Sequence, residues 1–538
     1  MSTARTQVLV VGGGVGGVAA ALAIAESGID TVLTEATDWL GGVLTSQAVP
    51  PDEHVWIEQF GCTRSYRRLR DEIRTFYRRC YPLTDRARGE QYLNPGGGHV
   101  SSLCCEPRPV VAVIEALLAP HRSSRRLRAL TRVAPVAVDG DGDRVAAVAL
   151  RDLRSGDDVV VEADLIVDAT ETGDLLALAD VEHVTGAEAV GDTGEPHAAP
   201  EPQPANMQPI SVCFALDHIA GEDHRIAQPD MYDTFRTQRR DGWPDGQLSL
   251  VAPDPRTNAP VTRSLSPNPP AEAAHDDQIH RNVDLDKDLW LFRRIADRHR
   301  FRPGTYDSDI TLVNWPQIDY WGGPVFGVPD DEVRTHLDRA GQLSLSLLYW
   351  LQHKAPRPDG GQGWPGLRLR GDVVGDTPDG LAKAVYIRES RRIRAEYTVV
   401  EQDIALDLRG SQGAKPYEDT VGIGCYRIDL HPSTGGDPYI DLGCCPFQIP
   451  LGALLPVRMD NLLPGGKNIG TTHITNGAYR LPPVEWNVGE VAGHLAAFCA
   501  GNRLVPRQVR ATPTLLEQFQ TRLAAAGVEL AWPVVAGY

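Results

Sequence analysis

The stretch VLVVGGGVGGVAAALAIAESGIDTVLTEA, residues 8–36, contains the parts of a strand–helix–strand unit in order. Val8–Val11 is a short apolar run, which is typical of a buried parallel strand. A glycine-rich turn and an apolar helix follow, and the helix ends at Gly28, a residue that favours a helix C-terminus. A second apolar run ends in an acid, Glu35. The chain is therefore expected to open with an α/β fold.

The glycine turn matches the GxGxxG pattern of dinucleotide-binding folds. Gly12 allows the tight turn, Gly14 lets the backbone approach a pyrophosphate, and Gly17 lets the helix lie close to the strand. The helix that follows, VAAALAIAES, points the N–H groups of its N-terminus and the positive end of its dipole towards the phosphates, and Val15 and Gly16 in the turn are further expected contacts. We therefore expect a dinucleotide at this turn.

The acid at the end of the second strand narrows the choice of dinucleotide. Glu35 follows Gly17 by 18 residues, and a carboxylate there accepts hydrogen bonds from ribose hydroxyls and repels the 2′-phosphate of NADP. NAD and FAD both remain open on this unit alone. A Gly41-Gly42 pair comes next and suits a loop that runs along the second half of the cofactor, although an ordinary glycine turn is the alternative. The expected contacts beyond the turn are Glu35, Ala36, Gly41, Gly42, Val43 and Thr45.

Composition limits the class of protein. A chain of 538 residues with 42% hydrophobic content predicts two domains or one domain with a large insertion. Its 53 basic and 71 acidic residues give a net charge of −18, which disfavours nucleic acid and anionic membranes as partners. We find no apolar run of about 18 residues and no room for a signal peptide before the first strand, so we expect a cytoplasmic protein. The nine cysteines lack metal-ligand spacing, so we expect no metal site.

A second segment, Asp143–Ala179, predicts a return of the chain to the same sheet. Two β-patterned runs flank a turn at Ser155-Gly156, and a separate buried strand is expected over residues 165–167. This strand runs into a turn of small residues. The expected cofactor contacts in the turn are Ala169, Thr170 and Gly173.

A third segment, Asn461–Gly501, begins with a short strand that runs into Gly465-Gly466. It ends in a helix that is expected to begin near Pro482-Pro483, because proline suits a first helical turn. Small residues recur along this helix at spacings of three and four, which favours tight packing on a neighbour. The expected cofactor contacts are Gly466, Lys467, Asn468 and Ile469.

Together these segments resemble the FAD-dependent oxidoreductase family of the glutathione-reductase-like flavoprotein superfamily, in a subgroup sometimes described as xanthan lyases. IRESRRIRAEYTVVEQDI (Ile387–Ile404) resembles the family's RESRRI segment, and YRIDLHPS (Tyr426–Ser433) resembles its Y-x-x-D-x-H-P segment. Residues 448–473 resemble its long run into the last cofactor loop. The sequence departs from the family at Lys467, where arginine is expected, and at Glu171, where many relatives carry glycine.

The resemblance implies FAD and a Rossmann-like FAD-binding domain of the glutathione-reductase type, discontinuous in sequence, with an inserted α+β substrate domain. The expected FAD-binding parts are residues 1–180, with a helical insertion near 50–95, and residues 456–505. Residues 181–455 are expected to form the substrate or cap domain, and residues 506–538 a C-terminal tail. In this superfamily the last helix points its N-terminus at the flavin pyrimidine edge, where its dipole stabilises negative charge on the reduced flavin.

Within the inserted part, composition and periodicity predict a few elements. Two stretches rich in proline, alanine and acids, the second ending at Asp277, are expected to be mobile loops. A strand is expected over Pro209–Ile219 and helices over Asp330–Ala355 and Asp379–Tyr397.

Flavin itself accepts a hydride, so the protein must supply orientation and a base. Histidine is the most common base near neutral pH. His473 directly follows the last cofactor loop and is the first candidate, although it could instead only hydrogen-bond the cofactor or the backbone; His431 is the second. Arg480 could bind a substrate carboxylate or influence the charge of the flavin, and Tyr479 lies beside it in the sequence.

The sequence favours an FAD-dependent dehydrogenase or oxidase that acts on a CH–OH or CH–NH bond of a small polar molecule. A flavin monooxygenase that uses NAD(P)H and oxygen, and a non-redox flavoprotein, are the alternatives. The chain has one clear GxGxxG, so a separate nicotinamide domain is not expected. The substrate, the electron acceptor, covalent flavin attachment and the oligomeric state stay open at this stage.

Overall fold

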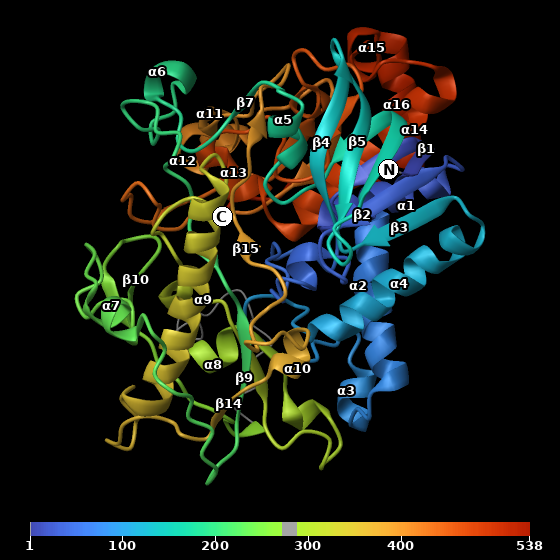
Figure 1. Ribbon diagram of the computed structural model, residues 1–538. Coiled ribbons are helices and arrows are strands. Elements are labelled where there is room, and N and C mark those ends of the chain that lie inside the picture. Colours follow the sequence, from blue (N-terminus) through green and yellow to red (C-terminus); the bar gives the residue numbers. More distant parts are fainter. Residues whose placement is uncertain (1, 272–287) are drawn as a thin grey trace.

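A seven-stranded sheet lies at the upper right of the computed structural model in Figure 1, and this model describes residues 2–271 and 288–538. In sheet order its strands are β3 (Leu127–Thr131), β2 (Thr31–Glu35), β1 (Ser2–Val11), β6 (Asp158–Asp168), β5 (Arg144–Asp152) and β4 (Val133–Asp141), with β21 (Leu462–Pro464) paired to β6. β1, β2, β3, β6 and β21 run parallel, whereas β4 and β5 are antiparallel to their neighbours. The chain thus returns to one sheet from three distant parts of the sequence.

β6 differs from its expected form. Instead of a hairpin strand followed by a separate strand over residues 165–167, one strand runs without a break from Asp158 to Asp168. Glu162 and Asp164 are exposed while Ala163 and Leu165 are buried, so the polar residues alternate outward and do not interrupt the strand. Its first half pairs with β5 and its end with β21.

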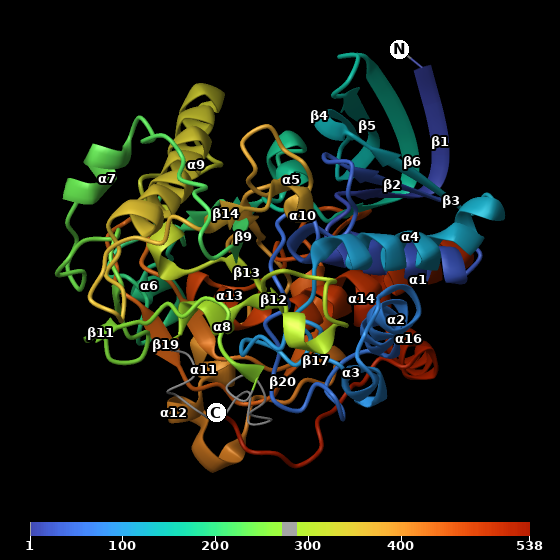
Figure 2. The ribbon, with the colours of Figure 1, turned by 90° about the horizontal axis from the view of Figure 1, so that it is seen from below.

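The expected opening unit is confirmed as β1, α1 (Val15–Glu26) and β2. α1 is buried on all sides from Val15 to Ala25, as its uniformly apolar sequence predicts. α14 (Pro482–Asn502) covers it, and the two helices touch backbone to backbone (Figure 2). A Cβ atom on Gly489 would lie 2.0 Å from the carbonyl oxygen of Gly16, and one on Gly493 would lie 2.5 Å from that of Ala20.

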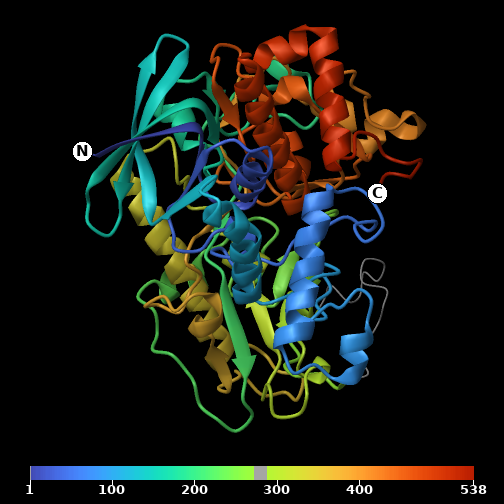
Figure 3. The same ribbon diagram turned by 90° about the vertical axis from the view of Figure 1, so that its right-hand side faces the viewer.

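Further helices pack around this pair. α4 (Pro107–Ser123) contacts α1, and α2 (Arg64–Cys80) contacts α4 and α14. α2 and α3 (Asp85–Gly89) fall in the expected helical insertion near residues 50–95. Figure 3 shows the C-terminal helices, in red, beside the N-terminal strands and helices, in blue. The red helices include α15 (Pro506–Ala511) and α16 (Pro513–Ala526).

A smaller antiparallel sheet lies below the large sheet in Figure 1. Its strand order is β12 (Arg294–Ala296), β13 (Ile310–Val313), β9 (Phe214–His218) and β14 (Leu367–Leu369). The strand expected over Pro209–Ile219 is confirmed in two pieces, β8 (Ile210–Ser211) and β9. The helix expected over Asp330–Ala355 is confirmed as α9 (Asp330–His353). Part of the expected second loop, residues 272–277, lies outside the described residues, and the expected domain boundaries stay a prediction.

The prediction of a helix over Asp379–Tyr397 is wrong. This segment is extended and contributes β15 (Tyr386–Ile387), which pairs with β8, and β16 (Arg392–Ile393), which pairs with β7 (His183–Val184). Its charged side chains are buried and pair with groups from distant parts of the chain, so tertiary contacts override the local periodicity.

The remaining elements are short. The helices are α5 (Asp174–Leu178), α6 (Val190–Thr193), α7 (Tyr232–Thr237), α8 (Leu289–Phe292), α10 (Gly371–Val374), α11 (Glu401–Ile404), α12 (Leu406–Arg409) and α13 (His473–Tyr479). The strands are β10 (Val251–Pro253), β11 (Pro260–Thr262), β17 (Thr420–Gly424), β18 (Ile428–Leu430), β19 (Ile440–Leu442) and β20 (Phe447–Pro450). Across the described ranges, we find no helix with the length and apolar character that a bilayer crossing requires.

Because α1 and α14 touch, the effect of one added methyl group on stability should depend on its position in α14. Gly489→Ala should destabilise the protein by about 1–3 kcal/mol, because the new Cβ meets backbone that cannot move aside. Gly501→Ala, in the same helix with nothing within 4 Å of the added Cβ, should be neutral or stabilising by up to about 1 kcal/mol. Chemical denaturation of both variants measures the difference. Equal effects would show that the helices tolerate a wider separation.

Candidate functional site

The glycines of the turn divide into two groups by what surrounds them. A Cβ on Gly12 would lie 2.3 Å from the carbonyl oxygen of Ala169, and one on Gly17 would lie 1.9 Å from that of Gly12. These two glycines are therefore required by packing. A Cβ on Gly14 would instead meet the end of a flexible side chain, Glu171, whose Oε1 would lie 2.8 Å away. Gly14 thus opens on a space that the surrounding backbone does not fill.

Glu35 is held against the same turn. Its Oε2 accepts a hydrogen bond of 3.0 Å from the Gly13 backbone, and its Oε1 accepts from the backbone and hydroxyl of Thr37 at 2.8 and 2.9 Å. Burial raises the pKa of Glu35, against the lowering effect of these donors. Oε1 thus accepts two hydrogen bonds already, whereas Oε2 keeps acceptor capacity for a ribose hydroxyl. Ala36 follows directly at the end of β2.

The loop after β2 reaches back to the turn. The Gly41 backbone donates to the carbonyl oxygen of Gly13 at 2.8 Å, and its φ of +112° favours glycine. A Cβ on Gly42 would lie 2.8 Å from the Cα of Gly14. Val43 is buried, and the Thr45 hydroxyl is bonded to the Leu40 carbonyl oxygen at 2.8 Å. The structure therefore brings residues 41–45 to the turn, with the Thr45 hydroxyl engaged inside the loop.

The turn after β6 meets the same place. Ala169 lies against Gly12, while the Thr170 hydroxyl donates to Asp168 Oδ1 at 2.7 Å. Burial raises the pKa of Asp168 to about 7. Gly173 lies further out, where an added Cβ would contact Ser390 at 3.1 Å. Of the three expected contacts here, Gly173 is the one directed away from the glycine turn.

The loop after β21 completes the assembly. A Cβ on Gly16 would lie 1.9 Å from the Gly465 carbonyl oxygen, so this loop presses on the start of α1. Asn468 binds the Asp168 carbonyl oxygen at 2.9 Å, and Ile469 is buried beside it. Lys467, directly before Asn468, forms an ion pair with Glu171 and lies 3.7 Å from Glu485, in the first turn of α14. Val15 and Gly466 complete the set of expected residues gathered here.

These residues fit FAD. The open space at Gly14, the start of α1 beside it and the acceptors of Glu35 match the needs of a diphosphate and an adjacent ribose. Lys467 adds a buried cation whose pKa is raised, because Glu171 and Glu485 outweigh the effect of burial. The residues that would hold FAD therefore come from all three predicted segments.

His473 begins α13 in a buried ionic network. Its Nδ1 lies 3.0 Å from Glu389 Oε2, its backbone donates to Glu188 at 2.8 Å, and Arg392 pairs with both carboxylates. Burial would raise the pKa of Glu389, but His473 and Arg392 lower it to about 2. Burial opposes charge on His473 in turn, but Glu389 raises its pKa. The ring therefore tends to hold its proton.

His431 lies in a second buried cluster. Its Nδ1 is 2.6 Å from Asp319 Oδ2, and its Nε2 is 3.6 Å from Asp429 Oδ2. Arg388 binds Asp319 at 2.8 Å, and Arg480 binds Asp429 at 3.0 Å. These cations and His431 hold the pKa of both aspartates below the ordinary value, although burial opposes them.

The side chains of His431 and Asp429 keep 18% and 19% of their surface exposed, so a small molecule can reach both of them. The charged groups around them form a ring of Asp319, Arg388, Asp429 and Arg480.

Three further residues extend this ring, and none of them was expected from the sequence: Arg293, Asp52 and Tyr386. Arg293 lies 3.2 Å from Asp52, and Arg480 donates to the Tyr386 hydroxyl at 2.8 Å. Arg293 is 8% exposed, yet its Nε and Nη1 have no hydrogen-bond partner among the residues that the structure describes. A buried guanidinium with free N–H groups is a binding site for an anion or a polar oxygen. No local pattern marks these residues, because their charges meet only in the folded chain.

Tyr479 faces away from this ring. Its hydroxyl donates to the Gln448 carbonyl oxygen at 3.0 Å, and its ring stacks on Phe447 with centroids 4.3 Å apart. Burial raises its pKa well above the usual range. These contacts are those of a packing residue.

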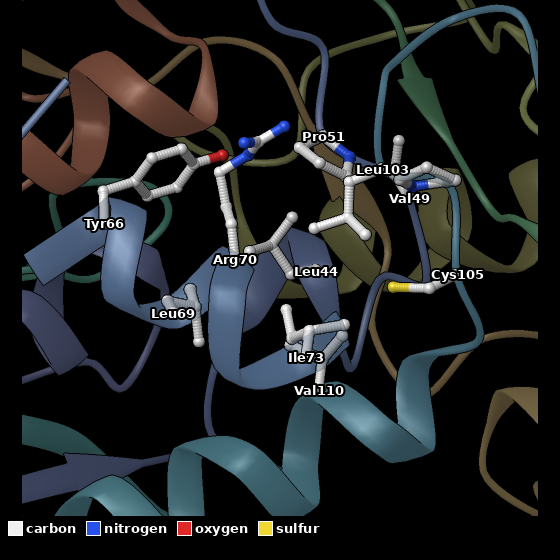
Figure 4. A pocket seen from close by; sticks show the side chains of 11 residues that line it. Leu44, Val49, Pro51, Tyr66, Leu69, Arg70, Ile73, Leu103, Cys105 and Val110 are labelled. Carbon is white, nitrogen blue, oxygen red and sulfur yellow. The ribbon is translucent and has the colours of Figure 1, made fainter. Parts of the chain in front are cut away.

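A cavity near the loop of residues 41–51 is too small for a ligand. Its volume is ≈ 10 Å³, which admits at most one water molecule. Figure 4 shows its mainly apolar lining, which includes Leu44, Val49, Leu69, Ile73 and Val110, with Tyr66 and Arg70 from α2.

A sequence model of the FAD dependent oxidoreductase family matches residues 7–523, nearly the whole chain. The chain belongs to this family. It is an FAD-dependent oxidoreductase, and the cofactor that the family implies agrees with the geometry of the glycine turn. A search of curated proteins finds no match.

Solved structures that match are distant. A geranylgeranyl bacteriochlorophyll reductase-like protein from Thermoplasma acidophilum is 11% identical, over 98% of this chain and 85% of that one, with a TM-score of 0.32. L-proline dehydrogenase from P. horikoshii is 14% identical over 35% of this chain and 24% of that one, with a TM-score of 0.18. The rebeccamycin biosynthetic enzyme REBC is 17% identical over 40% of each chain, with a TM-score of 0.24. The chain thus spans about a quarter of the dehydrogenase and two fifths of REBC, and these similarities are too low to indicate a substrate.

The open space at Gly14 predicts a variant that folds but holds no cofactor. Gly14→Val should purify as folded protein without flavin, because its side chain displaces only the movable end of Glu171 and occupies the place of the diphosphate. Gly191→Ala, where nothing lies within 4 Å of the added Cβ, should keep the flavin content of the wild type. Visible absorbance and circular dichroism measure flavin and fold. A folded Gly14→Val with full flavin would remove the turn from the binding site.

Proposed function

We propose that this FAD-dependent oxidoreductase oxidises a CH–OH or CH–NH bond of a small polar molecule by hydride transfer, and that His431 is the proton acceptor. The finer architecture we propose is a glutathione-reductase-type FAD-binding domain, built from residues 1–180 and 456–505, with residues 181–455 as the substrate domain. The FAD, when bound, supplies the group that takes up the hydride. The protein's own residues then have to bind, orient and deprotonate the substrate.

The observation that carries the proposal is the Asp319–His431 pair, in which the histidine side chain stays 18% exposed. Asp319 is buried and holds Nδ1 of the ring at 2.6 Å, whereas Asp429 lies 3.6 Å from Nε2, so Nε2 is the more loosely held nitrogen and the one proposed to take a substrate proton. The open surface of His431 gives a small molecule access to it. Arg388 and the Ser211 hydroxyl also bind Asp319, so its position does not depend on the histidine.

Arg480 and Arg293 are the proposed substrate-orienting groups. Both are buried, and Arg293 keeps unpartnered N–H groups that a carboxylate or hydroxyl oxygen of the substrate can occupy. Tyr386, bonded to Arg480 at 2.8 Å, adds a hydroxyl to the same wall. The substrate class that these groups suit is a small molecule with several oxygens, such as a hydroxy acid, an amino acid or a sugar derivative.

His473 was the first candidate from the sequence, and its role remains a proposal. Its ring is engaged by Glu389, whose negative charge favours the protonated form. Its side chain is 5% exposed against 18% for His431, so a substrate reaches His473 less easily. We therefore propose that His473 fixes the start of α13 and provides positive charge next to the last cofactor loop.

The two histidines should be distinguishable by kinetics. His431→Ala should slow substrate-driven flavin bleaching by about 100- to 10,000-fold with flavin content unchanged, because the proton acceptor is lost. His473→Ala should mainly lower thermal stability or flavin content, because Glu389 loses a buried partner. His121→Ala, in the last turn of α4, is the matched control.

The measurement is anaerobic stopped-flow absorbance, after hydroxy acids, amino acids and polyols have been screened for one that bleaches the flavin. Bleaching that slows in the His473 variant alone would make His473 the base and contradict the assignment to His431. Bleaching at the wild-type rate in both variants would remove histidine from the proton transfer.

A further inference from the structure

The space in front of Gly14 contains a carboxylate of the protein itself. Glu171 follows β6, and its Oε1 would lie 2.8 Å from a Cβ on Gly14 and 2.8 Å from a Cβ on Gly42. The next nearest atoms to that position on Gly14 are the carboxyl carbon of Glu171 at 3.8 Å and the carbonyl oxygen of Ala169 at 4.0 Å. Glu171 therefore stands where the turn admits an anion.

Lys467 fixes the carboxylate in this place. Its ammonium group pairs with Glu171 Oε2 and lies 3.7 Å from Glu485, and its side chain is 4% exposed. Glu171 is more open, with 24% of its side chain exposed. The cation is thus enclosed, and the Glu171 carboxylate is the more mobile partner.

The diphosphate of FAD and the Glu171 carboxylate compete for the same place. Glu171 and Glu485 already give two carboxylates around one ammonium group, and burial and Glu171 raise the pKa of Glu485 against the effect of Lys467. A diphosphate would add more negative charge at the start of α1. The diphosphate and the two carboxylates would repel one another strongly, because like charges are poorly screened in a buried site.

We propose that Glu171 is a displaceable counter-anion of the cofactor site. In the chain without FAD it neutralises Lys467 and fills the space at Gly14. FAD binding moves it outward towards solvent, and Lys467 then pairs with the oxygens of the diphosphate. The carboxylate thereby stabilises the empty site and weakens FAD binding, so this position sets how readily the protein exchanges its cofactor.

Glu171→Gln tests the proposal, because it removes the charge and keeps the size of the side chain. The variant should bind FAD at least about tenfold more tightly than the wild type when full-length protein stripped of flavin is titrated. ADP, which carries the diphosphate, should show the same gain, whereas riboflavin, which carries no phosphate, should show none. Glu162→Gln is the control, since it removes a charge from an exposed position of β6. If the stripped protein aggregates, FAD release from diluted holoprotein should slow by a similar factor.

Thermal unfolding separates this role from a merely structural one. Without FAD, Glu171→Gln should unfold at a lower temperature than the wild type, because Lys467 loses its partner. With saturating FAD, it should unfold at the same or a higher temperature. Lys467→Met should weaken the binding of FAD and ADP.

Two results would overturn the proposal. In the first, Glu171→Gln binds FAD no more tightly than the wild type and is less stable both with and without it, as expected if the carboxylate is only a structural partner of Lys467. In the second, riboflavin gains as much affinity as FAD, which would place the effect away from the diphosphate.

Discussion

The contact between α1 and α14 is the constraint on which the rest of the site depends. The two helix backbones touch at Gly16 and Gly489, and again at Ala20 and Gly493, with no side chain between them. The first turns of both helices meet the loop after β21, since a Cβ on Gly16 would lie 1.9 Å from the carbonyl oxygen of Gly465 and 3.2 Å from that of Glu485. The glycine turn, Lys467 and the two carboxylates near it are close neighbours only for this reason. Cofactor binding thus follows from how closely two helices can approach.

The part of the fold that depends on local sequence could be predicted. Val8–Glu35 specifies its strand, turn, helix and strand through apolar runs and glycines, and the small residues of α14 indicate its close packing. The extended segment around Arg388 was misread as a helix, because its periodicity is that of charged residues that find buried partners elsewhere. The sequence predicts a break in β6 that the structure does not have, because the exposed charged residues of a strand resemble those of a turn.

Those residues of the candidate site whose contacts lie within one short motif could be predicted, whereas those whose partners are distant in the sequence could not. The glycines and Glu35 act through neighbours in one motif, so the pattern alone located them. Asp52 and Arg293 are separated by 241 residues and meet only in the folded chain, so nothing in either local sequence marks them. The same holds for the pairing of Asp319 with His431. Buried ion pairs of this kind are tertiary features, and they surround the side chain of His431.

The identity of the bound cofactor is the most direct test that the glycine turn is part of an FAD-binding site. The account requires one FAD per chain, with its diphosphate at Gly14 and its adenosine ribose at Glu35. Heat release of the cofactor from purified protein, followed by chromatography against FAD, FMN and NAD standards, measures it. Release of FAD in an amount equal to the protein is the predicted result. A colourless protein that binds no added FAD, or one that releases NAD or FMN instead, would contradict the account.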